Sequence, residues 1–153
     1  MAGRLKEEIK QKRPFRSTEE EVVLAIMRTT DLVVAPLGEV LRAANLSTSQ
    51  YNILRILRGA EEPLPCGEIS ERMVRRDPDL TRLLDRMEKR GLIARERGTA
   101  DRRVVLSRIT EEGKALLASL DKPVDAALEQ ALAHVPKKRM ELLLELLEEV
   151  RGG

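Results

Sequence analysis

The stretch Asp77–Arg103, DPDLTRLLDRMEKRGLIARERGTADRR, carries the pattern that decides the fold. It opens on a helix start, because Asp77 can cap a first turn in which Pro78 leaves no N–H unpaired. Apolar side chains follow at the i, i+3, i+4, i+7 spacing of one helix face: Leu80, Leu83, Leu84 and Met87. Gly91 supplies the left-handed residue that commonly ends a helix, and Leu92 the hydrophobic contact after it. The stretch therefore predicts a helix that begins at Asp77 and stops sharply at Gly91.

Short strand-like segments follow this helix at 93–97 and 104–109. Gly98-Thr99-Ala100-Asp101 lies between them and predicts a β-hairpin. Helix, strand, charged hairpin tip and strand, in this order, are typical of a winged helix. In such a module one helix enters the DNA major groove and the hairpin, or wing, reaches sideways along the duplex.

The distribution of charge favours the same interpretation. The 153 residues have a formal net charge of only +2, yet residues 72–108 hold twelve Lys or Arg against six Asp or Glu, a local +6. Arginine outnumbers lysine twenty to eight, and its planar guanidinium suits two-point contact with phosphate or guanine. Basic patches also occur on proteins that bind no nucleic acid, so charge alone favours a DNA partner only modestly.

A long helix is predicted over residues 17–44. Ser17 and Glu20 have the spacing of a capping box at its start. Pro36 lies inside the helix and is expected to kink or split it, because proline has no N–H to donate. Asn45 can end it in a left-handed conformation.

Two shorter helices are predicted next. Ser47 and Gln50 form a capping box that starts the first of them. A connector over 61–65 leads to the second, at 67–74.

The carboxyl-terminal part of the chain predicts two further helices. Thr110 caps the first, which Pro123 should bend, and Pro136 opens the second. The last helix has leucines on more than one face: Leu142, Leu143, Leu144, Leu146 and Leu147. A helix that is apolar on two sides must bury both, and in a small chain a second subunit most easily covers the second side. We therefore expect a homodimer; the alternative is a helix covered on both sides by its own chain.

With its apolar stripe inward, the helix over 78–90 turns a polar face outward. The side chains that this face would present to DNA are Pro78, Asp79, Thr81, Arg82, Arg86 and Lys89. Residues near the start of a recognition helix meet base edges, so Asp79, Thr81 and Arg82 are candidate base readers. Asp85 is expected to orient a basic neighbour on the same helix or to accept a hydrogen bond from cytosine. The alternative is an ordinary solvated face with i, i+4 ion pairs.

The hairpin tip carries a second set of candidate DNA contacts. An exposed arginine on a narrow loop can enter the minor groove, where the negative potential is strong. We assign that role to Arg103, with Asp101 as a brace that holds it. Arg95, Arg97 and Arg102 are expected to contact phosphates. The alternative is an ordinary polar turn.

These pieces together resemble the MarR family of winged helix-turn-helix transcriptional regulators. The pieces are LSTSQYNILRIL (46–57), PDLTRLLDRMEKRGLIAR (78–95), DRR (101–103), VVLSRIT (104–110) and TEEGKALL (110–117). The resemblance runs from about Ser17 to Arg151 and rests on the order and spacing of the pieces.

The resemblance implies a mainly α fold with a small β-hairpin wing, in a single MarR-like domain over 1–153. Residues 17–44 and 111–151 would form dimerisation helices, and residues 47–109 the winged helix-turn-helix DNA-binding lobe. It also implies a homodimer on a palindromic double-stranded DNA site, usually a repressor that a small-molecule ligand releases.

In the family, such ligands bind between the dimer helices and the DNA-binding lobe. The residues that would line this cleft here are Arg28, Leu32, Tyr51 and Leu54. The resemblance also supports Asp101 and Arg103 as the wing pair. The chain departs from the family at Asp77-Pro78-Asp79, where many members have Ser or Thr. This acidic start leaves the base preference open.

The sequence gives little support for catalysis, metal binding or membrane insertion. It has no nucleophile-elbow motif, phosphate-binding glycine loop or H-E-x-x-H, so we expect neither an enzyme nor a cofactor. Cys66 and His134 are single residues of their kind, too few for an internal disulfide or a metal site. Cys66 is interpreted as a half-buried structural thiol, with a redox sensor as the alternative. No apolar run approaches the roughly 20 residues of a membrane helix, and no secretory signal is visible, so a cytoplasmic protein is expected.

The main hypothesis is therefore a dimeric, ligand-responsive transcriptional regulator. The alternative is a protein-interaction module on a winged-helix scaffold that has lost specific DNA binding. The operator, the effector and the direction of regulation stay open.

Overall fold

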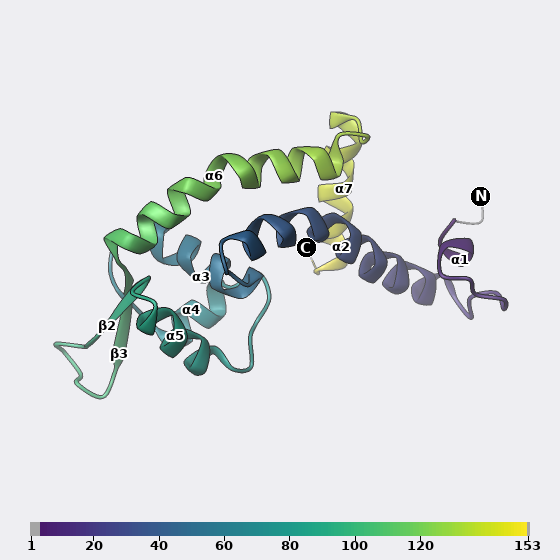
Figure 1. The fold of residues 1–153 in the computed structure, drawn as a ribbon. Coiled ribbons are helices and arrows are strands. Elements are labelled where there is room, and N and C mark those ends of the chain that lie inside the picture. Colours follow the sequence, from purple (N-terminus) through teal and green to yellow (C-terminus); the bar gives the residue numbers. More distant parts are fainter. Residues whose placement is uncertain (1–3, 153) are drawn as a thin grey trace. The chain divides into compact units, whose positions relative to one another are not determined.

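The computed structural model describes residues 4–152 and is mainly helical, with a small antiparallel sheet (Figure 1). The elements are α1 Leu5–Glu8, α2 Thr18–Ala43, α3 Thr48–Gly59, β1 Leu64–Pro65, α4 Cys66–Arg72, α5 Leu80–Lys89, β2 Ile93–Arg97, β3 Val105–Ile109, α6 Glu111–Leu132 and α7 Lys137–Val150. The mainly α fold with a hairpin wing is thus confirmed. None of the described helices is long and apolar enough to span a membrane.

Hydrogen bonds at the helix starts confirm one capping box and half of another. At α3, the Gln50 N–H donates to Ser47 Oγ at 3.1 Å and the Ser47 N–H to Gln50 Oε1 at 2.9 Å. At α2, Ser17 Oγ accepts from the Glu20 N–H at 3.2 Å. The Glu20 carboxylate, however, accepts from the Arg16 N–H at 2.6 Å. The second half of the expected box is therefore made one residue earlier in the chain.

The start of α5 differs from the prediction. The helix begins at Leu80 with Asp79 at the N-cap, and no side chain caps it. Asp77 Oδ1 instead accepts the Asp79 N–H at 2.9 Å. Aspartate often binds the backbone two residues on in a local turn, which competes with helix capping. The expected cap at Asp77 is therefore wrong, and Pro78 and Asp79 lie in the turn before the helix.

The end of α5 is as predicted. Gly91 has φ +73°, and its N–H donates to the Glu88 carbonyl at 2.9 Å, while the Leu92 N–H donates to the Met87 carbonyl at 3.1 Å. This pair of bonds is the Schellman motif, which satisfies the last carbonyls of a helix. The positive φ is the reason for glycine here, because side chains other than glycine's rarely adopt this conformation.

The sheet has the strand order β1-β3-β2. β2 and β3 form the predicted hairpin, with Ile93 opposite Ile109 and Arg97 opposite Val105. β1 was expected to be part of a connector, and that interpretation is wrong: Leu64 and Pro65 pair with β3. A strand of two residues is too short to show the period-two alternation by which strands are recognised.

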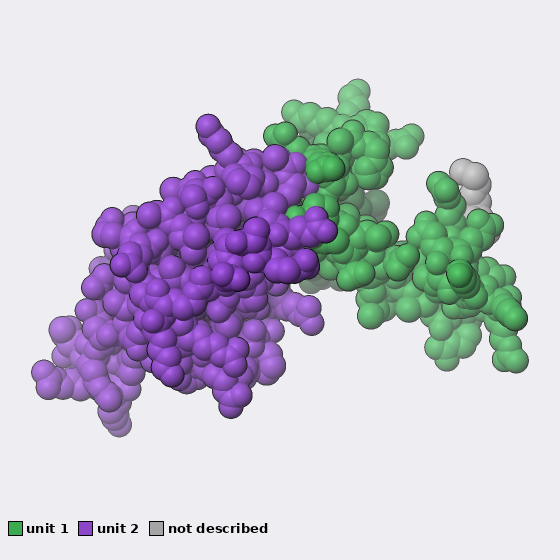
Figure 2. Space-filling model, in the orientation of Figure 1, with its two compact units in different colours: residues 1–36, 128–153 green, residues 37–127 purple. Residues whose placement is uncertain are grey.

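The chain divides into two compact units (Figure 2). The terminal unit comprises residues 1–36 and 128–153, and the central unit residues 37–127. The helices α2 and α6 each contribute to both units and continue through Pro36 and Pro123 without interruption, so Pro36 does not split α2.

The central unit has a well-formed apolar core. Its fully buried aliphatic side chains are Leu41, Ile53, Leu54, Ile69, Met87, Ile93 and Leu117. These side chains come from α2, α3, α4, α5, β2 and α6, so the core joins the helices to the sheet. The core therefore fixes α5 and the hairpin relative to each other within one unit.

Candidate nucleic-acid interface

The outer face of α5 is polar and exposed, as expected. Leu80, Leu84 and Met87 are buried on the inner side. Thr81, Arg82, Arg86 and Lys89 are exposed on the outer side. The face is thus held in place by its own apolar stripe and leaves its basic side chains accessible.

The basic side chains of this face differ in their pairing. Arg82 Nε lies 3.6 Å from Asp79 Oδ2, an exposed and loose contact. Arg86 and Lys89 have no ion-pair partner within residues 4–152. Their charges are therefore available to an anionic partner such as a phosphate backbone.

Arg95 is engaged by two carboxylates of α5. Its Nη2 atom lies 2.5 Å from Asp85 Oδ1 and 2.9 Å from Glu88 Oε1. The Arg95 backbone N–H also donates to Glu88 Oε2 at 3.1 Å. The hydrogen bond from Arg95 lowers the pKa of the Glu88 carboxyl, and the same bond raises the pKa of the guanidinium. These contacts fasten β2 to the recognition helix.

This arrangement corrects one expectation and changes another. Asp85 was expected to orient Arg82, Arg86 or Lys89, and it binds Arg95 on β2 instead. Arg95 was expected to contact a phosphate, but its side chain is only 23% exposed and its charge is balanced within the unit. Its guanidinium therefore balances the charge of two carboxylates of α5, Asp85 and Glu88.

The wing tip contains the brace that the sequence predicts. Asp101 Oδ1 accepts from the Arg103 N–H at 3.0 Å and from Arg103 Nε at 3.2 Å, and Arg103 Nη2 donates to Asp101 Oδ2 at 3.3 Å. The hydrogen bond from Arg103 lowers the pKa of the Asp101 carboxyl. The Arg103 side chain is nevertheless 92% exposed. Arg103 is therefore held by its backbone N–H and by its guanidinium, while its side chain stays accessible.

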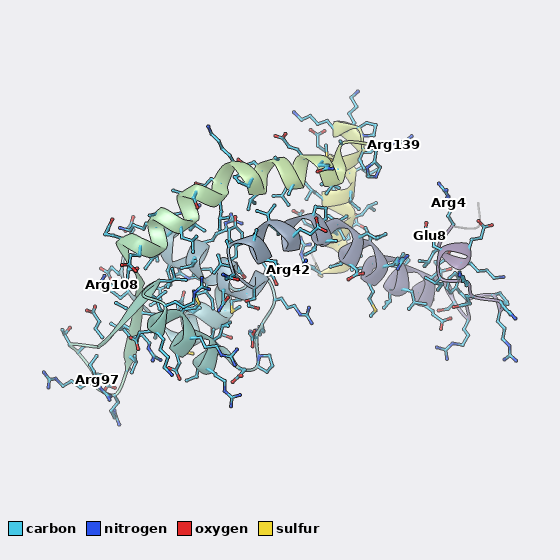
Figure 3. The ribbon with its side chains drawn as sticks, in the orientation of Figure 1. Arg4, Glu8, Arg42, Arg97, Arg108 and Arg139 are labelled. Atoms are coloured by element: carbon cyan, nitrogen blue, oxygen red, sulfur yellow. The ribbon has the colours of Figure 1, made fainter. Side chains whose placement is uncertain are left out.

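A second contact shapes the wing. Arg97, which Figure 3 labels on the hairpin, donates from Nη1 to the Arg102 carbonyl at 3.1 Å. The Gly98 N–H donates to the Val104 carbonyl at 2.9 Å, and a Cβ atom on Gly98 would lie 2.8 Å from the Asp101 carbonyl oxygen. Arg102 itself is exposed. The tip is thus a tight loop with arginines on its outside.

Two arginines ahead of α5 were missed as candidate contacts. Arg75 and Arg76 are exposed in the loop that leads to Asp79, next to the exposed Val74. The Val74 N–H donates to Asn52 Oδ1 at 2.8 Å, which fixes the start of this loop on α3. Both arginines belong to the basic stretch 72–108, which is the signal in the sequence that points to them.

The residues expected to line an effector cleft are placed in different surroundings. Leu54 is 0% exposed and Tyr51 is buried in the core of the central unit, so neither side chain is open to solvent in this structure. Both lie on the buried side of α3, and their contact with a ligand stays a prediction. Arg28 and Leu32 are exposed on α2, in the terminal unit.

The central unit contains a cavity of about 400 Å³ beside α5. Its lining residues are Pro65, Cys66, Gly67, Thr81, Leu84, Arg95, Val104, Val105 and Ser107. Cys66 is half-buried in this wall. Over residues 4–152, no three His, Cys, Asp or Glu side chains are grouped so that they could hold a metal ion.

Comparison with known proteins identifies this architecture. The model of the MarR family matches residues 46–105. The homoprotocatechuate degradative operon repressor of Escherichia coli is 29% identical over 131 residues, which cover 85% of this chain and 87% of that protein. The crystal structure of a MarR transcription factor from Planctomyces limnophilus is 37% identical with a TM-score of 0.68, covering 88% of this chain and 98% of the other.

A further solved relative has been seen with DNA and with a small molecule. The transcriptional repressor CouR bound to a 23-mer DNA duplex is 23% identical with a TM-score of 0.71, covering 99% of this chain and 97% of the other. CouR from Rhodococcus jostii RHA1 has also been solved with p-coumaroyl-CoA, with a TM-score of 0.73, 23% identity, and coverage of 89% and 95%. These two structures show the same fold. From the matched segment and the 37% identical relative, this chain belongs to the MarR family of winged helix-turn-helix transcriptional regulators.

Proposed function

We propose that this protein is a dimeric, sequence-specific repressor that binds a palindromic operator and is released by a small molecule. The observation that carries the DNA-binding part is the wing: Arg103 is braced by Asp101 and still 92% exposed. The name of the relative from E. coli supports repression as the output. On this proposal the protein acts by binding in the cytoplasm and catalyses no reaction.

On the DNA, each subunit would contact the duplex with two parts of its central unit, the helix α5 and the wing. The exposed face of α5 with Thr81, Arg82 and Arg86 would enter the major groove, preceded by the turn at Pro78 and Asp79. Arg103 would enter the adjacent minor groove. The remaining basic side chains would contact phosphates: Arg75, Arg76, Lys89, Arg97 and Arg102.

The dimer is supported by the apolar surface of the terminal unit. In α7, no side chain is buried, and Leu142, Leu143, Leu144 and Leu146 are 43–61% exposed. On α2, Val22, Val23, Met27 and Leu32 are exposed as well. Large apolar patches on soluble proteins mark interaction surfaces. Residues 17–44 and 111–151 would therefore pair two subunits, each presenting the DNA-binding lobe over 47–109.

Release by a small molecule is supported by the cavity beside α5. A ligand there would touch Thr81 and Leu84 on the recognition helix and Val105 on the wing strand. A ligand shifts an equilibrium only by binding one geometry better than another. Occupancy would favour a spacing of the two recognition helices of the dimer that fits DNA less well. Arg28 and Leu32 on α2 would form a second contact region for a ligand.

The test is selection from a randomised duplex library followed by sequencing, at about 150 mM salt so that sequence-blind phosphate binding is weak. The expected result is a palindrome with half-sites roughly 10 bp apart, one helical turn. Binding that is weak, sequence-blind and lost on adding salt would contradict the proposal. It would favour the alternative, a protein-interaction module that has lost specific DNA recognition.

A further inference from the structure

Arg90 sits where the recognition helix ends. It is the C-cap residue of α5, and its backbone N–H donates to the Arg86 carbonyl at 3.1 Å. Its side chain extends away from α5 to the end of α2. Nη1 donates to the Asn45 carbonyl at 2.5 Å and Nη2 to the Ala44 carbonyl at 3.4 Å.

The two carbonyls belong to the end of α2. Ala43 is the last residue of that helix, and Asn45 follows with φ +53°. The Leu46 N–H donates to the Leu41 carbonyl at 2.9 Å, so α2 ends in a Schellman motif, as α5 does. Carbonyls at a helix end lack intrahelical donors and carry the negative end of the helix dipole, which a guanidinium satisfies.

Arg90 therefore caps two helices at once, α5 with its backbone and α2 with its side chain. We infer that Arg90 is a positioning residue, which fixes the recognition helix on the end of α2 and does not itself bind DNA. Arg86, one turn earlier, has no ion-pair partner in the described chain and faces outward with the candidate DNA contacts. The inference rests on DNA binding and deepens it, because α2 is also the helix expected to pair the subunits.

The salt dependence of operator binding separates the two roles. Each phosphate contact contributes about one unit to the slope of log K against log salt concentration. Arg90→Ala is expected to weaken operator binding about tenfold, the scale of one charge-assisted hydrogen bond, with the slope unchanged. Arg86→Ala is expected to lower the slope by about one unit. Arg90→Lys should recover part of the affinity, because its ammonium can still donate to a carbonyl.

Arg58→Ala is the matched control for general destabilisation. Arg58 Nη1 donates to both carboxylate oxygens of Asp121 at 3.1 Å, and this contact joins α3 to α6 in the same unit without touching α5. R58A should leave operator affinity within about twofold of wild type. In hydrogen exchange, amides of 86–92 and 41–46 should exchange faster in R90A and not in R58A.

Three results would overturn the inference. A slope reduced in R90A as in R86A would make Arg90 a phosphate contact. An unchanged operator affinity in R90A would show that the contact of Arg90 with α2 is dispensable for DNA binding. An equal loss of affinity in R58A would show that R90A acts through the general stability of the central unit. If the wild-type protein bound no specific operator, the proposed function would fail, whereas the hydrogen-exchange result would still test the link between α5 and α2.

Discussion

The two units of this protein differ in how far their leucine side chains are buried. In the central unit, Leu41, Leu54 and Leu117 are fully buried and share one core. In the terminal unit, Leu142, Leu143, Leu144 and Leu146 of α7 are exposed, and no side chain of α7 is buried. Burial of apolar surface is the main favourable term in folding. The central unit therefore buries an apolar core of its own, whereas α7 leaves apolar side chains exposed that a second copy would cover in the proposed dimer.

The largest effect is expected in the core of the central unit. Leu54→Ala removes a fully buried side chain and should lower the free energy of unfolding by about 2–5 kcal/mol, because a cavity remains. Urea denaturation followed by circular dichroism measures this. The control Leu54→Met keeps the volume and should cost less than about 1.5 kcal/mol. A loss for L54A no larger than that of L54M would contradict the core as described.

A smaller effect, and of a different kind, is expected on α7. Leu144→Glu places a carboxylate on the proposed dimer face, and burying it unpaired costs about 2 kcal/mol or more. The dimer should therefore dissociate at micromolar concentration while the central unit stays folded. Light scattering after gel filtration gives the mass, and circular dichroism the folding. Leu144→Met is the control and should stay dimeric; an L144E dimer of unchanged affinity would place the interface elsewhere.

The two units are also expected to differ in how substitutions affect operator affinity, because the wing belongs to the central unit. Arg103→Ala should weaken binding by about 1–3 kcal/mol, the usual cost of losing a groove-reading arginine. Asp101→Ala should cost less, since it removes the brace and leaves the arginine. Arg102→Ala should mainly lower the salt slope by about one unit. Fluorescence anisotropy on the selected operator measures each variant, and wild-type affinity in R103A would remove Arg103 from the interface.

The smallest effect is expected at Arg95. Arg95→Ala leaves Asp85 and Glu88 without their partner on a helix that faces phosphate. Exposed charge effects are about 1 kcal/mol or less and fade with salt. Operator affinity should therefore fall slightly at low salt and recover when Glu88→Gln is added to R95A. If the double variant bound no better than R95A, the carboxylates would not be what Arg95 neutralises.

Features with local causes could be predicted from the sequence. The apolar stripe of α5, the Gly91 stop and the Ser47–Gln50 capping box each depend on residues within one or two helical turns. The Asp101–Arg103 brace is equally local, with one residue between its partners. In all of these the chemistry of neighbouring side chains leaves little choice of structure.

Features that depend on distant or competing partners could not be predicted. The Asp77 carboxylate can either cap the helix or accept a hydrogen bond from the Asp79 N–H in a local turn. The sequence pattern does not indicate which of the two forms. The partner of Asp85 is Arg95, which reaches it only because β2 folds back against α5. The full burial of Leu54 could not be predicted either, because which part of an apolar helix face is covered depends on what packs against it.

The wing has one more consequence. Its described contacts run between its own residues: Gly98 with Val104, Asp101 with Arg103, and Arg97 with Arg102. The segment from 97 to 104 is therefore held in shape by its own contacts and is joined to the rest of the protein through the strands β2 and β3. On the proposed function, exchange of this segment between relatives is therefore expected to transfer minor-groove preference without any change to the core.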